Sequence, residues 1–139
     1  ARMSVIQQFS AVTAACLLVR KSVYEEAGGL DEVNLVVAFN DVDFCIRLNK
    51  LGYKNIWTPY AELYHHESAT RGQDIAPDKR ARFVREVNYM TDTWGNDFAD
   101  DPAYNPNLNL DFPDFTLSKT DRVGKWNMKI PLKPSKQDY

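Results

Sequence analysis

Two short segments carry the residues of this chain that could perform acid–base or metal chemistry. Asp41 and Asp43 lie two positions apart in the first segment, and His65 and His66, the chain's two histidines, are adjacent in the second. Divalent cations bind carboxylate oxygens and imidazole nitrogens, and a free carboxylate can accept a proton from a substrate hydroxyl. The residue types therefore predict one site that combines a divalent cation with a general base.

Each pair also has a plainer interpretation. Asp41 and Asp43 would lie in the first turn of a helix, where carboxylates cap free N–H groups and favour the positive end of the helix dipole. His65 and His66 would lie on opposite faces of a strand, so at most one of them can point into a shared site. A single inward histidine is more often a hydrogen-bonded interior residue than a ligand. Taken alone, neither pair decides between a site and a structural role.

The elements that must position these residues follow from apolar runs and turn-forming residues. Residues 10–20 are almost continuously apolar, which predicts a central strand buried on both faces. A helix should then begin at Ser22, which forms a capping-box pattern with Glu25, and end at Gly28 and Gly29.

The acidic pair is expected to open a second helix. Asn40 and Asp41 are both good N-cap residues, and Gly52 should end this helix. Its predicted inward side chains are Val42, Cys45, Ile46 and Leu48. Strand pieces at 54–57 and 61–66 follow, and the second ends at the histidine pair.

A third helix is expected to begin at Pro77. Its predicted apolar stripe consists of Val84, Val87, Met90 and Trp94. Pro and Asn then interrupt any regular period, which predicts a mostly irregular tail. The chain is thereby divided into a folded part, residues 1–95, and an extended tail, residues 96–139.

Length and composition are those of one globular domain. The chain has 139 residues and a net charge of -2, which gives no indication of nucleic-acid binding. Cys16 and Cys45 lie in apolar runs and are predicted to be buried free thiols of a reducing compartment. No run is long and apolar enough to span a membrane and no signal-peptide pattern opens the chain, which together predict a cytoplasmic protein.

The end of the chain is basic. Its cations are Lys119, Arg122, Lys125, Lys129, Lys133 and Lys136. With Trp126, Met128 and Ile130 among them, this segment could make peripheral contact with an anionic membrane at the inner face of the cell membrane. A solvated tail is favoured over this alternative because the cations are widely spaced.

The order of the segments resembles the C-terminal half of the family 2 glycosyltransferases. The motifs that carry the resemblance are Gly28-Gly29-Leu30-Asp31, Asn40-Asp41-Val42-Asp43 with Arg47, Gly52-Tyr53, the stretch from Tyr64 to Gly72, and the stretch from Asp101 to Leu108. These proteins are inverting bacterial enzymes of the GT-A fold, many of which assemble capsule and O-antigen polysaccharides. The resemblance covers about residues 10–110.

The resemblance implies a fold and an activity. The fold would be α/β, the acceptor-side portion of a GT-A domain, with a short mixed sheet, about three helices and a long irregular tail. The activity would be transfer of a sugar from a nucleotide-sugar donor to a saccharide or lipid-linked acceptor with inversion.

The resemblance also assigns roles to individual residues. Asp41 stands where the family has the general base that deprotonates the acceptor hydroxyl. Asn40 stands where the family usually has a Glu that contacts the acceptor, so a hydrogen-bonding group remains but a charge is lost. Gly29 and Asp31 would also contact the acceptor, and Asp43 would support the start of the helix. A plain helix C-cap explains Gly29 equally well.

On the donor side, the resemblance implies a divalent cation, Mn or Mg, that holds the diphosphate. His65 matches a ligand of this cation and is preferred to His66, because its offset to Thr70 fits the family pattern better. Arg71 would belong to a mobile loop that closes over the diphosphate.

One part of a GT-A enzyme has no counterpart in this sequence. In the family, a nucleotide-binding half with an Asp-x-Asp motif precedes these segments and supplies the main metal ligand, and nothing before Ser10 matches it. The chain is therefore expected to be a piece of a larger enzyme, inactive alone and with its metal site unoccupied. The edge on which the other half would pack could drive self-association.

Two other classes of function remain open. A non-catalytic carbohydrate-binding or docking module would use the same aromatic and polar groups without needing Asp41. A small metal-dependent hydrolase would use both histidines and an Asp as a closed ligand set, which the alternation of side chains along a strand disfavours.

Overall fold

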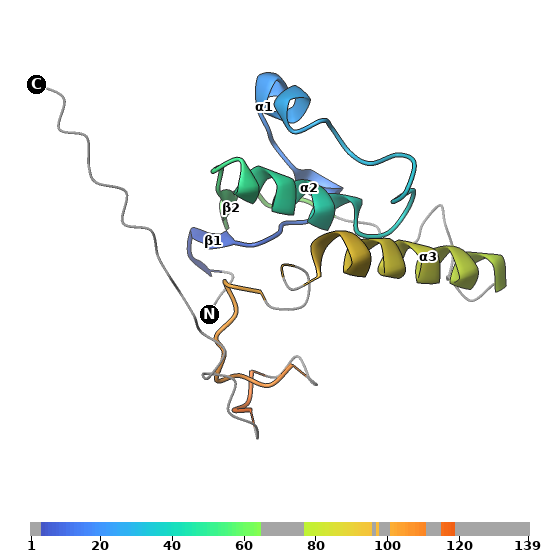
Figure 1. Ribbon diagram of the computed structural model, residues 1–139. Coiled ribbons are helices and arrows are strands. Elements are labelled where there is room, and N and C mark those ends of the chain that lie inside the picture. Colours follow the sequence, from blue (N-terminus) through green and yellow to red (C-terminus); the bar gives the residue numbers. More distant parts are fainter. Residues whose placement is uncertain (1–3, 65–76, 96, 98–100, 111–114, 119–139) are drawn as a thin grey trace, which may run out of the picture. The chain divides into compact units, whose positions relative to one another are not determined.

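Six short elements form the first of two units in this computed structural model, which describes residues 4–64, 77–95, 97, 101–110 and 115–118 (Figure 1). The two units comprise residues 1–103 and 104–139. In chain order the elements are β1 (Gln7–Phe9), the 3-10 helix η2 (Ala14–Cys16), α1 (Lys21–Glu26), α2 (Asn40–Lys50), β2 (Asn55–Trp57) and α3 (Pro77–Trp94). In the part of the chain that the structure describes, no helix is long and apolar enough to cross a membrane.

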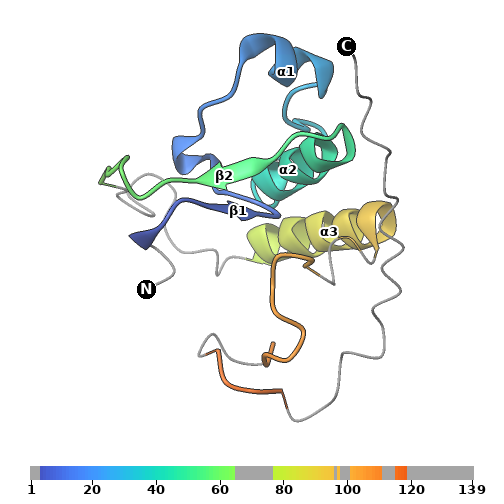
Figure 2. The same ribbon diagram turned by 90° about the vertical axis from the view of Figure 1, so that its left-hand side faces the viewer.

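β1 and β2 form an antiparallel pair that lies beside α2 (Figure 2). Gln7 is opposite Trp57, and Phe9 is opposite Asn55. Asn55 is buried and its side-chain amide donates to the backbone oxygens of Ser10, at 2.9 Å, and Cys45, at 3.2 Å. This amide therefore joins the strand pair to α2. The mixed sheet of a GT-A domain stays a prediction.

The apolar segment 10–20 does not form the predicted buried strand. It contains η2, whose N-cap Thr13 accepts a hydrogen bond from the N–H of Ala15 at 3.2 Å, and Leu18 is 99% exposed. The N–H of Val12 donates to Sγ of Cys45, and the N–H of Ala14 to Asp41. The prediction is wrong because side chains of α2 take N–H groups that a strand ladder would use.

Burial of the two cysteines was predicted correctly only for Cys45. Cys45 is fully buried in α2, whereas Cys16 is exposed at the end of η2. The prediction for Cys16 is wrong for the same reason as the strand predicted at residues 10–20. η2 lies where a strand covered on both faces was expected.

α1 has the predicted position and end, but a different start. Its N-cap is Arg20, which makes no side-chain capping bond, so the capping box expected from Ser22 and Glu25 is wrong. Gly28 and Gly29 have φ angles of 81° and 70°, a left-handed conformation that favours glycine. They end the helix as predicted.

α2 is the central element of the described core. One cluster of buried and half-buried side chains forms around Ala27, Phe44 and Leu48, and a second around Leu35, Ile46 and Met90. The predicted inward residues Cys45, Ile46 and Leu48 are buried, and Val42 is half-buried.

α2 begins at Asn40 as predicted, but its N-cap is Phe39, with φ at 65°, and not Asn40 or Asp41. The N–H of Asp43 donates to the backbone oxygen of Phe39 at 2.8 Å. A left-handed backbone is uncommon for a bulky residue, so contacts elsewhere in the fold must stabilise it.

α3 begins at the predicted Pro77, but its buried face differs from the predicted stripe. Met90 is fully buried, whereas Val84 is 48% exposed. Glu86, four residues before Met90, is only 2% exposed. The strand expected at 61–66 is absent from residues 61–64, which are irregular and exposed, and residues 65 and 66 lie outside the described residues.

The second unit is irregular where it is described. Leu108 and Leu117 form an isolated antiparallel bridge. The hydroxyl of Tyr104 donates to the backbone oxygen of Asn109 at 2.8 Å, and its ring packs against Phe115 with the ring centroids 6.1 Å apart. The basic segment 119–139, with the predicted membrane contact, lies outside the described residues.

Candidate functional site

Asp41 lies in the first turn of α2, between that helix and η2. Its Oδ1 accepts a hydrogen bond from the N–H of Val42 at 2.9 Å, and its Oδ2 accepts one from the N–H of Ala14 at 3.1 Å. The side chain is half-buried. Each carboxylate oxygen has further lone-pair capacity, so a carboxylate held in this way can still accept a proton from a substrate.

The same face of α2 holds the segment before η2. Cys45, one helical turn after Asp41, donates from Sγ to the backbone oxygen of Val12 at 3.7 Å. Burial raises the pKa of the Cys45 thiol, and the nearby Asp41 carboxylate raises it further. The thiol is therefore kept neutral and acts as a packing and hydrogen-bonding group.

Asp43 faces the opposite side of α2 and is 3% exposed. Its carboxylate accepts hydrogen bonds from Nε and Nη2 of Arg47, at 2.9 and 2.7 Å, and from Nε1 of Trp94 at 2.9 Å. Arg47 in turn donates to the backbone oxygens of Ala27 and Gly29. Asp43 thus has the contacts of a structural residue that connects α2, α3 and the end of α1.

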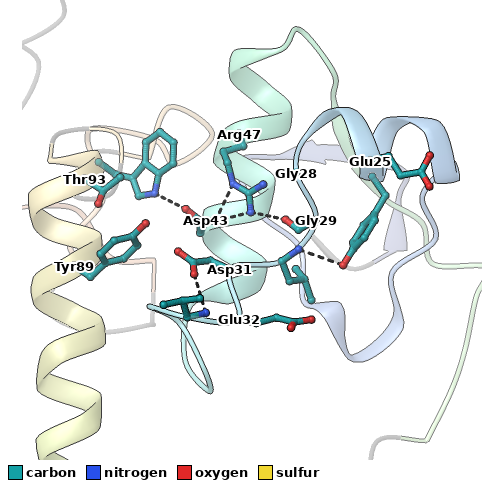
Figure 3. Close-up of a pocket in the computed structure, with 13 residues that line it drawn as sticks. Glu25, Gly28, Gly29, Asp31, Glu32, Asp43, Arg47, Tyr89 and Thr93 are labelled. Atoms are coloured by element: carbon teal, nitrogen blue, oxygen red, sulfur yellow. Dashed lines mark hydrogen bonds and ion pairs between the residues drawn. The ribbon is translucent and has the colours of Figure 1, made fainter.

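A pocket of about 920 Å³ lies on this second face, between the loop after α1 and α3 (Figure 3). Its lining residues are Tyr24, Glu25, Gly28, Gly29, Leu30, Asp31, Glu32, Val33, Asp43, Arg47, Tyr89, Thr93 and Trp94. Figure 3 shows Tyr89 and Thr93 of α3 opposite the loop that carries Gly28, Gly29, Asp31 and Glu32. We call this cavity the α3 pocket.

Asp31 is strongly held at the edge of the α3 pocket. Its carboxylate accepts hydrogen bonds from the N–H groups of Val33 and Asn34, at 3.0 and 2.8 Å, from the Asn34 amide, and from the Tyr89 hydroxyl. Burial acts to raise the pKa of Asp31, but these hydrogen bonds outweigh it and lower the pKa to about 2. The same bond raises the pKa of Tyr89. Asp31 is therefore an ionised acceptor at neutral pH.

The predicted acceptor-side residues separate into two places. Gly29 and Asp31 line the α3 pocket together with Asp43, whereas Asn40 and Asp41 do not line it. Two positions along an α-helix correspond to a rotation of about 200°, which explains why Asp41 and Asp43 face different surroundings.

The predicted metal ligands cannot be placed. His65, His66 and Arg71 lie outside the described residues. Among the residues that are described, no group of three or more His, Cys, Asp or Glu side chains could hold a metal ion. That part of the chain does not form a metal site by itself, and the Mn or Mg ion stays a prediction.

Glu86 is a residue of this region that the sequence analysis missed. Its Oε1 accepts a hydrogen bond from the N–H of Val37 at 3.0 Å, and its Oε2 accepts one from the N–H of Ala38 at 3.1 Å. The next residue is the left-handed Phe39, whose ring lies 5.6 Å from that of Phe83, centroid to centroid. α3 therefore holds the chain at the point where α2 begins.

A sequence signal for Glu86 does exist. Phe83 and Met90 are three residues before it and four residues after it, so all three side chains share one face of a helix. A carboxylate on an apolar face is costly to bury unless it is hydrogen-bonded, so its presence there indicates buried donors.

The chain is similar to parts of longer bacterial proteins. It is 56% identical over 118 residues to the uncharacterized protein y4gI of Sinorhizobium fredii, which covers 84% of this chain and 13% of that protein. It is 35% identical over 114 residues to the O-antigen biosynthesis protein RfbC of Myxococcus xanthus, covering 82% of this chain and 8% of that protein. It is 33% identical over 81 residues to the N-acetylglucosaminyl-diphospho-decaprenol L-rhamnosyltransferase of Mycobacterium tuberculosis, covering 58% of this chain and 26% of that protein.

The last two similarities indicate a glycosyltransferase family. No family model matches the chain, and no solved structure matches it either. The chain spans about a quarter or less of the length of each of these relatives.

Proposed function

We propose that this chain is the acceptor-side part of an inverting glycosyltransferase of surface-polysaccharide synthesis, with Asp41 as the general base. The observation that carries the proposal is the placement of Asp41. Two backbone N–H groups orient its carboxylate at the start of α2, and the side chain is only half-buried. The similarity to a rhamnosyltransferase and to an O-antigen biosynthesis protein supports the reaction class.

In the proposed reaction, Asp41 accepts the proton of an acceptor hydroxyl. The acceptor oxygen attacks the anomeric carbon of a nucleotide sugar from the face opposite the nucleotide, and the bond from that carbon to the diphosphate oxygen breaks. The bonding pair leaves with the nucleoside diphosphate, so the anomeric configuration inverts. His65 is the predicted ligand of a Mn or Mg ion and Arg71 the predicted contact of the diphosphate, and both lie outside the described residues.

The proposal places the donor-binding half outside these 139 residues, so its test uses a longer polypeptide in which a nucleotide-binding half precedes this chain. Transfer from a panel of radiolabelled nucleotide sugars to saccharide and lipid-linked acceptors is measured first. Asp41→Asn should then lower kcat by about 10²–10⁴-fold, the contribution of general base catalysis, because an amide cannot take the proton.

The matched control is Asp97→Asn, which removes a carboxylate from an exposed side chain that pairs with Lys50 at the surface. This variant should keep the parent's kcat, and both variants should keep its melting temperature within a few degrees. An Asp41→Asn enzyme as fast as the parent would show that the base is another residue. Transfer by the chain without a nucleotide-binding half would contradict the proposed division of the enzyme.

One observation favours a second candidate, a non-catalytic carbohydrate-binding module. The α3 pocket has a volume of about 920 Å³, and Asp41 does not line it. A binding module would take up saccharides without any transfer, and Asp41→Asn would then leave binding unchanged. The same panel of assays distinguishes the two functions.

A further inference from the structure

The charge of the α3 pocket is unsuited to a phosphate group. Arg47 is the only cation among the lining residues that the structure describes. Its guanidinium donates to the Asp43 carboxylate and to the backbone oxygens of Ala27 and Gly29. Figure 3 shows it turned to Asp43 and Gly29. This cation is therefore engaged by the protein itself.

The remaining charges of the α3 pocket are negative. Glu25 has a partner outside the pocket, since its carboxylate lies 3.6 Å from Nζ of Lys21. Arg47, which already pairs with Asp43, is the only cation in the described lining that could balance the charges of Asp31 and Glu32. A diphosphate without a bound divalent cation would meet net repulsion here, so the described lining does not favour a free anion.

The same lining suits an uncharged molecule with many hydroxyl groups. Asp31 and Asp43 already accept several hydrogen bonds from the protein, so Glu32 is the lining carboxylate that offers acceptor positions to hydroxyl groups, and bonds to a charged acceptor are stronger than neutral ones. Tyr24, Tyr89 and Trp94 add aromatic surface, which covers the C–H faces of a sugar ring. The volume of about 920 Å³ falls within the range of about 300–1,000 Å³ typical of small-molecule sites.

The position of the α3 pocket separates it from the proposed base. Asp41 is held on the η2 side of α2, by the N–H of Ala14, while the pocket lies on the Asp43 side. A sugar in the pocket is therefore not the one whose hydroxyl Asp41 deprotonates. We propose that the α3 pocket, formed by the loop with Asp31 and Glu32 and by Tyr89 and Trp94, binds a second saccharide unit of the acceptor, beyond the unit that reacts.

The role as part of an acceptor rests on the proposed function, whereas saccharide binding by the pocket does not. The first experiment therefore measures binding to the isotope-labelled chain by amide chemical shifts. The probes are methyl α-L-rhamnopyranoside, N-acetylglucosamine and methyl α-D-glucopyranoside, with pyrophosphate and ethanolamine as charged comparisons. At least one sugar should shift the amides of Asp31 and Thr93, and neither charged probe should do so.

Variants then locate the binding. Glu32→Gln and Tyr89→Phe should each weaken sugar binding by about tenfold, the equivalent of one hydrogen bond to a charged or oriented group. Tyr60→Phe is the control, because Tyr60 is 84% exposed and lies outside the pocket. Absence of shifts with all sugars, shifts with pyrophosphate or ethanolamine, or unchanged binding by both variants would each overturn the assignment.

The second experiment tests the role in transfer, in the longer polypeptide. The acceptor that the transfer assay identifies is compared with an analogue that lacks the second sugar unit. In the parent enzyme the two-unit acceptor should have the lower KM. Glu32→Gln should raise the KM of the two-unit acceptor more than the KM of the analogue. Equal KM values for both acceptors in the parent enzyme would overturn the role in the acceptor. Absence of transfer with any acceptor would instead contradict the proposed function. The binding experiment would still test whether the α3 pocket binds a saccharide.

Discussion

The two faces of α2 use carboxylates in opposite ways. Asp41 is half-buried and is held by two backbone N–H groups, which leaves it able to exchange protons with a ligand. Asp43 is almost fully buried and accepts from Arg47 and Trp94. The comparison shows that two acidic residues of one motif can differ in burial and in partners because the helix turns them to different neighbours.

The largest stability difference should separate these two residues. Asp43→Ala leaves Arg47 and the Trp94 N–H without their common acceptor and should lower the free energy of unfolding by about 3 kcal/mol, as for a buried ion pair that loses one partner. Asp41→Ala should cost only about 1 kcal/mol, because it removes two hydrogen bonds near solvent. Urea unfolding at neutral pH measures both. Equal losses would break the comparison between the faces.

Glu86→Gln tests the contact by which α3 supports the start of α2. The amide can accept from one of the N–H groups of Val37 and Ala38 but not from both, so the free energy of unfolding should fall by about 1–2 kcal/mol. Amide hydrogen exchange should become faster at one of these two residues. Glu62→Gln, at an exposed position, is the control and should change neither quantity. Unchanged exchange in Glu86→Gln would show that packing alone holds this segment.

Asp31→Asn tests the pH dependence of the pocket face. The pKa of Asp31 is lowered from 3.8 to about 2, so its ionised form stabilises the fold above pH 3.8, and this contribution is lost as the pH falls toward 2. The parent should therefore be more stable than the variant at neutral pH, with a difference that shrinks between these two pH values. Unfolding free energies at several pH values measure it. A difference independent of pH would mean that the carboxyl charge is not involved.

Leu18→Ser should have the smallest effect, below about 0.5 kcal/mol, because this side chain is 99% exposed in the chain. Leu48→Ala is the contrasting variant, because Leu48 is buried in the cluster against which the neighbouring Leu17 packs. It should lower the free energy of unfolding by about 2–3 kcal/mol. Thermal or urea unfolding compares the two. A loss at Leu18 as large as that at Leu48 would mean that the segment 10–20 is covered in solution.

The helices were predictable because their signals are local. Glycines with left-handed φ end α1, Pro77 begins α3, and the apolar period of α2 matches its buried side chains. The N-caps of α1 and α2 were less predictable. Phe39 has no capping side chain, and its conformation depends on Glu86 and Phe83, which are more than forty residues away in sequence.

The segment 10–20 shows the limit of reading burial from an apolar run. An apolar run indicates that burial of these side chains against another surface would be favourable. It does not indicate whether that surface is a sheet or the side of a helix. Here the N–H groups of Val12 and Ala14 bond to Cys45 and Asp41 of α2. Sequence spacing alone does not reveal such long-range side-chain acceptors.

The candidate site was predictable in part for the same reason. The position of Asp41 at the start of a helix follows from local pattern, and so does its separation from Asp43 by helical rotation. The grouping of Asp31 with Tyr89 and Trp94 required the packing of α3 against α2, which no motif encodes. The placement of His65, His66 and Arg71 stays a prediction, since these residues lie outside the described part.

The unequal exposure of the two cysteines provides an internal measure of local opening of the fold. A thiol reagent can reach Cys16 in the folded chain, whereas it can reach Cys45 only after α2 separates from the segment around Val12. The modification rate of Cys45 relative to Cys16 would therefore report how often the face that carries Asp41 opens. A ligand that closes this face would slow the reaction of one thiol and leave the other as its reference.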